Sequence, residues 1–159
     1  MTTIKITKAS IEDLQAILLL QKQAFISEAD IYNDFDISPP LLQTLGDLTK
    51  EFSEQAFLKA LLGDNIVGSV RGFQVNDSVF IKRLIVNPHY QNQGIGTKLM
   101  KSIEDSFKDA KRYELFTGHK SVRNLHLYHK LGYKEFKRIP IHENLTMVYL
   151  EKYVNLQIT

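Results

Sequence analysis

A strand, a loop with two glycines and a helix follow one another in the C-terminal half of the chain. Residues 79–86, VFIKRLIV, are rich in β-branched side chains and predict a strand that ends before Pro88, because proline cannot donate to a β-ladder. The apolar spacing after Gly96 predicts a helix over residues 97–109. Gly94 and Gly96 lie between these elements, where the absence of a Cβ lets backbone N–H groups come close to an anion. Because a helix N-terminus adds unpaired N–H groups and a partial positive charge, this order predicts a phosphate-binding loop.

Two common nucleotide-binding motifs do not fit this loop. A dinucleotide fingerprint has three glycines, one of them almost directly after the strand, whereas residues 87–93 intervene here. A Walker loop ends in Gly-Lys-Ser/Thr, and the order here is Gly96-Thr97-Lys98. An isolated pair of glycines is also typical of a plain turn at the start of a helix, so the surrounding residues must decide.

The rest of the chain alternates between strand and helix patterns, without a repeat or a linker. In chain order the patterns predict a strand at 4–6, a helix from residue 11 into the acidic segment 27–38, a helix over 41–52, strands from 55 to 86 with turns at 63–65 and 76–77, the helix over 97–109, a strand at 113–117, a helix over 121–131, and strands at 133–138 and 145–154. This order predicts a single domain over 1–159 of the α/β (α+β) class, with a mixed sheet and flanking helices.

Composition and charge exclude several classes of protein. The absence of cysteine excludes a disulfide framework, a thiolate zinc site, an iron–sulfur centre and a cysteine nucleophile. Twenty Lys and Arg against 18 Asp and Glu are too balanced to indicate nucleic-acid binding, and the five histidines lack metal-ligand spacing, so no metal is expected. The longest apolar run, 16–20, is too short for a membrane span, and the N-terminus lacks a signal pattern. We therefore expect a cytoplasmic protein with no membrane partner.

Two motifs together carry a family resemblance. Gln91, Gly94 and Gly96 meet the pattern Q/R-x-x-G-x-G/A, with V-x-P just before it at 86–88. Residues 127–133, LYHKLGY, meet the pattern L-Y-x-K-L-G-Y/F. In these motifs the chain resembles the GNAT superfamily of acyl-CoA-dependent N-acetyltransferases. The resemblance implies a single domain whose mostly antiparallel, mixed central sheet is flanked by helices, with a splayed strand pair at the acyl-CoA site.

The resemblance also implies roles for the matching residues, with acetyl-CoA as cosubstrate. The backbone of Leu84, Ile85 and Val86 would pair with the pantetheine arm. The Tyr128 hydroxyl would lie beside the cofactor sulfur and protonate the departing thiolate as a general acid. The residues that would wrap the pyrophosphate are Gln91, Asn92, Gln93, Gly94, Ile95, Gly96 and Thr97.

Two positions depart from the family pattern. Many relatives have an asparagine seven residues before the tyrosine, where this chain has Ser121. Asn124, four residues before Tyr128, shares its helix face, so we expect Asn124 to hold the pantetheine and Ser121 to cap the helix, although either could contact the cofactor. Relatives often carry a glutamate on the strand before the loop, whereas this strand carries Lys82 and Arg83.

The missing strand glutamate leaves the general base open. The acidic segment after the first helix forms one wall of the acceptor pocket in GNAT proteins. Glu28 or Asp34 would there attract an ammonium group and take its proton. His119, at the end of a predicted strand, and water are the alternatives.

These observations predict an enzyme that moves an acetyl group from acetyl-CoA to a primary amine by direct attack in a ternary complex. The acidic segment favours a cationic small molecule or a peptide amine as acceptor, with no nucleic-acid partner. A non-catalytic acyl-CoA sensor or regulatory module of the same fold is the alternative, because the strand lacks its carboxylate. The identity of the acceptor and the formation of a homodimer are left open by the sequence.

Overall fold

The computed structural model describes residues 3–154, which form one seven-stranded sheet and five α-helices. The sheet has the order β1-β2-β3-β4-β5-β7-β6. The strands are β1 (Ile4–Lys8), β2 (Ala56–Leu62), β3 (Asn65–Val75), β4 (Ser78–Val86), β5 (Arg112–Gly118), β6 (Lys134–His142) and β7 (Leu145–Tyr153). The helices are α1 (Leu14–Tyr32), α2 (Pro39–Leu42), α3 (Leu45–Glu54), α4 (Ile95–Asp105) and α5 (Val122–Lys130), with 3-10 turns at Ile11–Asp13 and Pro88–Tyr90.

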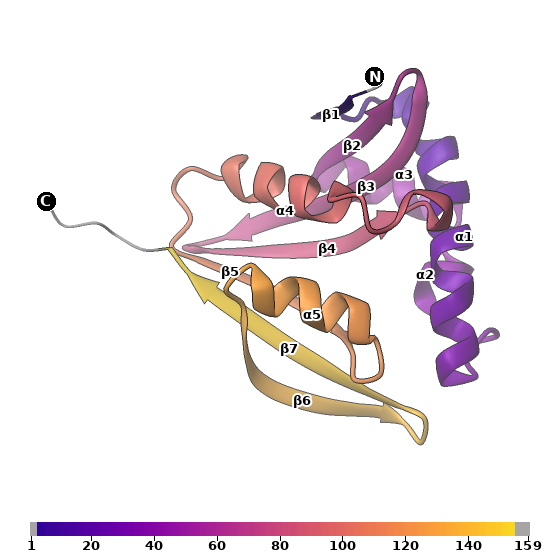
Figure 1. Ribbon diagram of the computed structural model, residues 1–159, viewed down its shortest axis with the longest axis vertical. Helices are drawn as coiled ribbons and strands as arrows, with labels where there is room; N and C mark the ends of the chain where they lie inside the picture. Colours follow the sequence, from indigo (N-terminus) through magenta and orange to yellow (C-terminus); the bar gives the residue numbers. More distant parts are fainter. Residues whose placement is uncertain (1–2, 155–159) are drawn as a thin grey trace, which may run out of the picture.

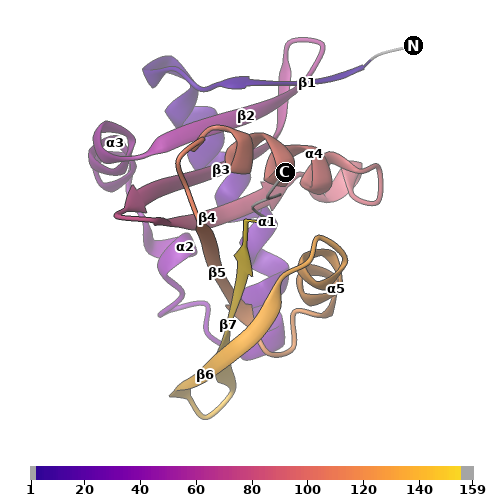
Figure 2. The same cartoon turned by 90° about the vertical axis from the view of Figure 1, so that its left-hand side faces the viewer.

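Helices cover both faces of the sheet (Figure 1 and Figure 2). On one face, Ile17 of α1 and Leu48 of α3 are fully buried against Phe57 of β2. On the opposite face, Leu99 and Ile103 of α4 are buried among residues of β2, β3 and β4. Two hydrophobic cores therefore fix the N-terminal half of the sheet from both sides, which confirms the predicted class of a mixed sheet flanked by helices.

The parallel contact between β4 and β5 is short. Only the segment from Ser78 to Phe80 pairs with β5, while the other neighbouring strands pair antiparallel over most of their lengths. Figure 1 shows β4 and β5 together at one end and diverging toward α1. The splayed strand pair that the family resemblance implies is therefore present, and it opens beside the second half of α1.

The helix expected over residues 41–52 is wrong, because two helices occupy this region. Gln43 adopts an extended conformation with ψ of 136°, which ends α2. The Thr44 hydroxyl then accepts a hydrogen bond from the Asp47 N–H, and the Asp47 carboxylate accepts one from the Thr44 N–H. This reciprocal cap starts α3 as a separate helix.

The other helices differ less from expectation. α1 ends inside the acidic segment, where Asn33 takes a φ of 51°, so Glu28 belongs to a helix. α4 begins at Ile95, two residues earlier than predicted, because Gly94 already serves as its N-cap. Within residues 3–154, every helix is too short or too polar to span a bilayer.

Candidate active site

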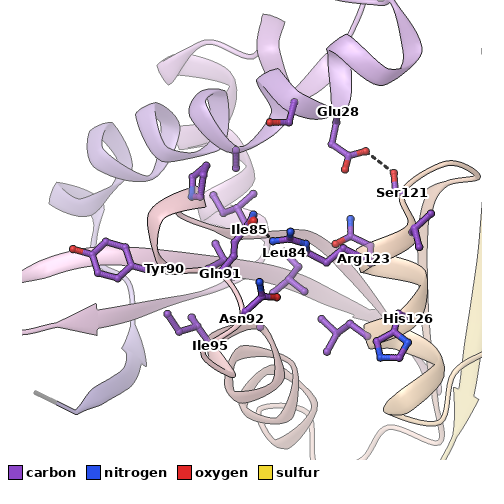
Figure 3. Close-up of a pocket in the computed structure, with 18 of the residues that line it drawn as sticks. Glu28, Leu84, Ile85, Tyr90, Gln91, Asn92, Ile95, Ser121, Arg123 and His126 are labelled. Carbon is purple, nitrogen blue, oxygen red and sulfur yellow. Dashed lines mark hydrogen bonds between the residues drawn. The ribbon is translucent and has the colours of Figure 1, made fainter.

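A cavity of about 690 Å³ opens where β4 and β5 diverge. Its walls come from the second half of α1, the end of β4, the loop and first turn of α4, and α5 with the loop before it. In Figure 3, Glu28 lies on one side of this cavity, Asn92 belongs to the loop, and His126 belongs to α5. In the part of the chain that the structure describes, no group of three or more His, Asp or Glu side chains could hold a metal ion.

The loop before α4 offers unpaired backbone donors to the cavity. Gly94 lies in the left-handed region with φ of 79°, and a Cβ built there would meet nothing within 4 Å. Among the described residues, no backbone carbonyl accepts a hydrogen bond from the N–H groups of residues 91–97. These donors adjoin the N-terminus of α4, whose dipole also favours negative charge. The arrangement fits the pyrophosphate of coenzyme A.

The end of β4 provides a free backbone edge. Beyond Phe80, β4 pairs with β3 on one side but not with β5 on the other. Leu84, Ile85 and Val86, the residues expected to pair with the pantetheine arm, line the cavity. An extended chain that contains amide groups, such as a pantetheine arm, can add to such an edge as an extra strand.

Basic side chains of α5 and of the loop before it form another wall of the cavity. Arg123, His126 and Lys130 of α5 line the cavity together with Lys120, and Arg123 donates a hydrogen bond to Oε1 of Gln91. These residues were missed by sequence reasoning, although the spacing of three and four residues in the predicted helix places them on one face. The positive side chains of Lys120, Arg123 and Lys130 suit a ligand that carries several phosphates.

Hydrogen bonds tie a carboxylate of α1 to the loop before α5. The Ser121 hydroxyl donates to Oε2 of Glu28, as the dashed line in Figure 3 shows. Tyr32 Oη lies 2.8 Å from Ser121 Oγ and accepts a hydrogen bond from the Lys120 N–H at 2.8 Å. Since the Ser121 proton is given to Glu28, the Tyr32 hydroxyl donates to Ser121. The chain of donors therefore runs toward Glu28, which is half-buried and lines the cavity.

The position of Tyr32 depends on the absence of a side chain at Gly118. A Cβ added to Gly118 would lie 2.2 Å from Tyr32 Oη, so any other residue would displace the tyrosine. Sequence reasoning gave no role to Tyr32 or Gly118. Tyr32 and Ser121 are 89 residues apart, and no local pattern reveals a contact over that separation.

Tyr128 is buried beneath the site. Its side chain is 5% exposed, packs near Tyr133 in the core and is not part of the cavity lining. Burial, and then the negative charge of Glu28, raise the pKa of the Tyr128 phenol. The phenol is therefore protonated at neutral pH and lies close enough to Glu28 to feel its charge.

Asn124 and Ser121, the two alternatives for the pantetheine contact, both line the cavity. The Asn124 amide donates to Thr117 Oγ1 at 3.3 Å, which links α5 to the end of β5. Ser121 is the N-cap residue of α5, but its hydroxyl bonds to Glu28 and Tyr32 and caps no backbone N–H. The expected capping bond is therefore wrong, and the Ser121 hydroxyl belongs to the carboxylate network.

Besides Tyr128, three further predicted residues lie outside the cavity lining. Asp34 is buried, with Oδ2 3.4 Å from Nε2 of His142 at the end of β6. Nδ1 of His119 accepts a hydrogen bond from the Thr146 N–H at 3.0 Å, so this ring nitrogen is already occupied. Gln93 is exposed in the loop. Of the three base candidates among the side chains, the structure brings only Glu28 to the cavity.

Comparison with known proteins establishes the family. The profile of the Acetyltransferase (GNAT) family matches residues 14–133, and the chain belongs to this family. The structure of yncA from Salmonella typhimurium with its cofactor acetyl-CoA gives a TM-score of 0.76 at 16% identity, over 98% of this chain and 96% of that one. The PaiA N-acetyltransferase of Thermoplasma acidophilum, in complex with coenzyme A, gives a TM-score of 0.73 at 21% identity, over 96% of this chain and 99% of that one. At these identities the likeness is one of fold.

A curated relative is similar over part of its length. The UPF0157 protein YqkA of Bacillus subtilis is 25% identical over 131 residues, which cover 82% of this chain. The match covers 37% of that relative, so the chain spans little more than a third of its length.

Proposed function

We propose that this protein transfers the acetyl group of acetyl-CoA to a primary amine by direct attack. The observation that carries the proposal is the meeting of two features in one cavity: the unpaired N–H groups of residues 91–97 and the hydrogen-bonded carboxylate of Glu28. The first feature suits a pyrophosphate and the second suits an ammonium group. A donor and an acceptor held side by side gain rate from proximity, without a covalent enzyme intermediate.

The chain's own residues account for binding of the donor. Acetyl-CoA supplies an activated thioester carbonyl, and the N–H groups of residues 91–97 bind its pyrophosphate. Arg123 and Lys130 offset the phosphate charge, and Asn124 adds a hydrogen bond to the pantetheine arm. The free edge of β4 at residues 84–86 orients that arm, and a backbone N–H of this strand polarises the thioester oxygen.

Glu28 is the group that we assign as general base. The acceptor amine arrives as an ammonium ion and must lose a proton before its nitrogen can attack. Ser121 holds Oε2 of Glu28 by a hydrogen bond, which fixes the carboxylate and leaves Oε1 for the ammonium group. Asp34, the other carboxylate considered from the sequence, faces His142 instead. Glu28 takes the first proton from the ammonium group and releases it to water. The amine nitrogen then bonds to the carbonyl carbon as the carbon–sulfur bond breaks, and its second proton passes to Glu28.

Tyr128 is the general acid in this scheme. The leaving thiolate takes the phenolic proton and becomes a neutral thiol, and the phenolate then regains a proton from water. The raised pKa of the phenol keeps this proton in place until negative charge develops nearby. Among the described residues, the hydroxyls of Tyr32, Tyr113 and Tyr133 form hydrogen bonds with protein groups, whereas the Tyr128 hydroxyl forms none. The Tyr128 proton is therefore available to the leaving group.

Two measurements test the proposal. Acetyl-CoA should raise Tm more than NAD or ATP at equal concentration, by an amount that corresponds to about 2.7 kcal/mol at a hundredfold excess over Kd. A panel of primary amines with acetyl-CoA, read by thiol release, should then identify acceptors. Binding without turnover on every amine would instead favour an acyl-CoA sensor, and no binding would overturn both functions.

A further inference from the structure

A bulge in β4 contains two cationic residues, Lys82 and Arg83, directly before the strand residues that line the cavity. The pairing of β4 with β3 shifts register between Lys82 and Ile85, and Arg83 takes a φ of 54° within this shift. The left-handed region is strained for a bulky side chain, and such strain persists only where the surroundings impose it. Bulges often re-aim a side chain next to a functional site. The left-handed conformation of Arg83 therefore indicates a functional role for this part of β4.

Both cations belong to the sheet face that α1 and α3 cover. Lys82 lies directly opposite Arg71 in the ladder, so the two side chains share a face. Arg71 reaches Gln21 of α1 at 3.0 Å and Glu51 of α3 at 2.6 Å, which identifies that face. The charge of Arg83 lowers the pKa values of Arg71 and Lys82, and Glu51 acts on the pKa values of all three, so we treat Arg71, Lys82, Arg83 and Glu51 as one charge cluster.

This cluster contains more positive than negative charge. Glu51 is the carboxylate that acts on all three cations, and it already binds Nε of Arg71 and the Gln43 amide at 2.8 Å. Three cations against one carboxylate leave two positive charges unbalanced. Nε of Arg83 is buried and has no hydrogen-bond partner among residues 3–154. Lys82 and Arg83 are half-buried, and desolvation without a paired charge is unfavourable, so the cluster is suited to an anion that the described residues do not supply.

The location connects this charge with the reaction. Lys82 and Arg83 immediately precede the β4 residues that line the cavity, and one strand residue advances the chain by only about 3.3 Å. On α1, Gln21 contacts the cluster through Arg71, and Glu28 lies seven residues further on the same helix face. Seven helical residues span about 10 Å. Glu28 therefore lies about 10 Å along the helix from the residue that contacts the cluster, which is a span that a small acceptor can cover.

We propose that Lys82 and Arg83 form an anion subsite of the acceptor pocket, so that the acceptor is a primary amine that also carries a carboxylate or phosphate group. The inference rests on the proposed acetyl transfer and specifies its substrate class. The ammonium end of the acceptor faces Glu28, and the oxyanion end faces the cations. This charge pattern separates zwitterionic acceptors from polyamines, which lack the oxyanion.

Matched acceptors and variants test the subsite. Free amino acids are compared with their carboxamides, and O-phosphoethanolamine with ethanolamine, which separates carboxylate from phosphate recognition. For the preferred pair, wild type should favour the anionic member in kcat/KM by roughly 10- to 100-fold, the usual worth of a charged hydrogen bond. Lys82→Met and Arg83→Asn should reduce this preference mainly through KM. Asparagine tolerates the left-handed backbone, and Arg83→Lys should restore part of the preference.

The control is Lys111→Met, which removes one positive charge beside Asp77, at the other end of β4. This variant should keep the preference. Equal use of anionic and neutral acceptors by wild type, or a preference unchanged in both subsite variants, would overturn the subsite while leaving acetyl transfer intact.

A binding measurement remains informative if no tested amine is acetylated. With coenzyme A saturating, inorganic phosphate should raise Tm of wild type and of Lys111→Met relative to chloride at equal ionic strength. The same addition should have little effect on the Lys82→Met and Arg83→Asn double variant. An equal phosphate effect in wild type and the double variant, or none in wild type, would overturn the subsite whatever the acceptor panel gives. Failure of acetyl-CoA itself to bind would overturn the proposed function.

Discussion

Two walls of the cavity are built from different chemical groups. The loop of residues 91–97 and the edge of β4 present backbone N–H and C=O groups, whose positions follow from chain conformation. Another wall presents the side chains of Glu28 and Ser121, whose positions follow from their hydrogen bonds to each other and to the buried Tyr32 behind them. A wall made of backbone groups keeps its hydrogen-bonding positions when most side chains change, provided that the chain conformation is kept. A wall made of side chains loses a functional group with a single substitution. The backbone wall is therefore suited to a ligand that all members of a family share. The side-chain wall is suited to functions that differ between members, such as proton transfer and selection of the acceptor.

The largest effect is expected from Tyr128→Phe. The change removes the proposed proton donor and almost no volume, so kcat should fall about 100- to 10,000-fold while Kd for acetyl-CoA stays unchanged. Tyr133→Phe is the matched control, because Tyr133 is also buried but donates to Glu104 at 2.7 Å, away from the cavity. Wild-type turnover of Tyr128→Phe, with chemistry shown to limit the rate, would remove Tyr128 from the mechanism.

Glu28→Gln should reduce kcat by about 100-fold, since it removes the proposed proton acceptor. It should also change the acid limb of the pH–rate profile without altering acetyl-CoA binding. Asp30→Asn makes the same charge change at an exposed position of α1 and should behave as wild type. A rise in KM alone for Glu28→Gln would mean that the carboxylate only attracts the amine, and the role of base would then pass to water.

Gly94→Ala should weaken acetyl-CoA binding by about tenfold, because a methyl group would enter the space where phosphate approaches the loop. Gly63→Ala is the control for backbone strain. Gly63 also has a positive φ, of 62°, with nothing within 4 Å of a built Cβ. Both changes should cost roughly 1–2 kcal/mol of stability, as left-handed residues with a Cβ do. Equal acetyl-CoA affinity in the two variants would contradict the phosphate-loop assignment.

Alkaline pH should reveal the buried phenol as a smaller effect on stability. Burial raises the pKa of Tyr128 above the unfolded value of about 10, so folding favours the protonated form. The free energy of unfolding should be unaffected by this group below pH 10 and should fall above it, by about 1.4 kcal/mol per pH unit for each such tyrosine. Urea unfolding of wild type and Tyr128→Phe between pH 9 and 11 measures the difference. Identical slopes would show that Tyr128 titrates freely in the folded state.

The backbone wall could be predicted from the sequence because it requires particular residues in a local order. Pro88 ends the strand, and Gly94 supplies a positive φ at the N-cap of α4. The separation of α2 from α3 was missed although its signal is local, since Thr44 and Asp47 form a capping box within a run of leucines. The spacing of the leucines led to the prediction of one continuous helix. In the structure, the hydrogen bonds between Thr44 and Asp47 start a separate helix instead.

The side-chain wall could be predicted only in part. Glu28 was singled out because it is acidic and follows the first helical stripe, but Asp34, in the same segment, turns to His142. Their difference arises from the end of α1 at Tyr32 and from the β6–β7 hairpin, neither of which a local pattern encodes. The position of the Tyr32 side chain depends on the absence of a Cβ at Gly118. These two residues are far apart in the sequence and meet only in the folded chain.

The most direct test of the account is the fate of the acetyl group. The protein is incubated with acetyl-CoA labelled in its acetyl group and with an acceptor found in the amine panel. The masses of the amine and of the intact protein are then measured by mass spectrometry. Direct transfer predicts one labelled acetyl group on the amine nitrogen for each thiol released, and none on the protein. Label that accumulates on the protein before it reaches the amine, or thiol release without an acetylated amine, would contradict direct transfer at this site.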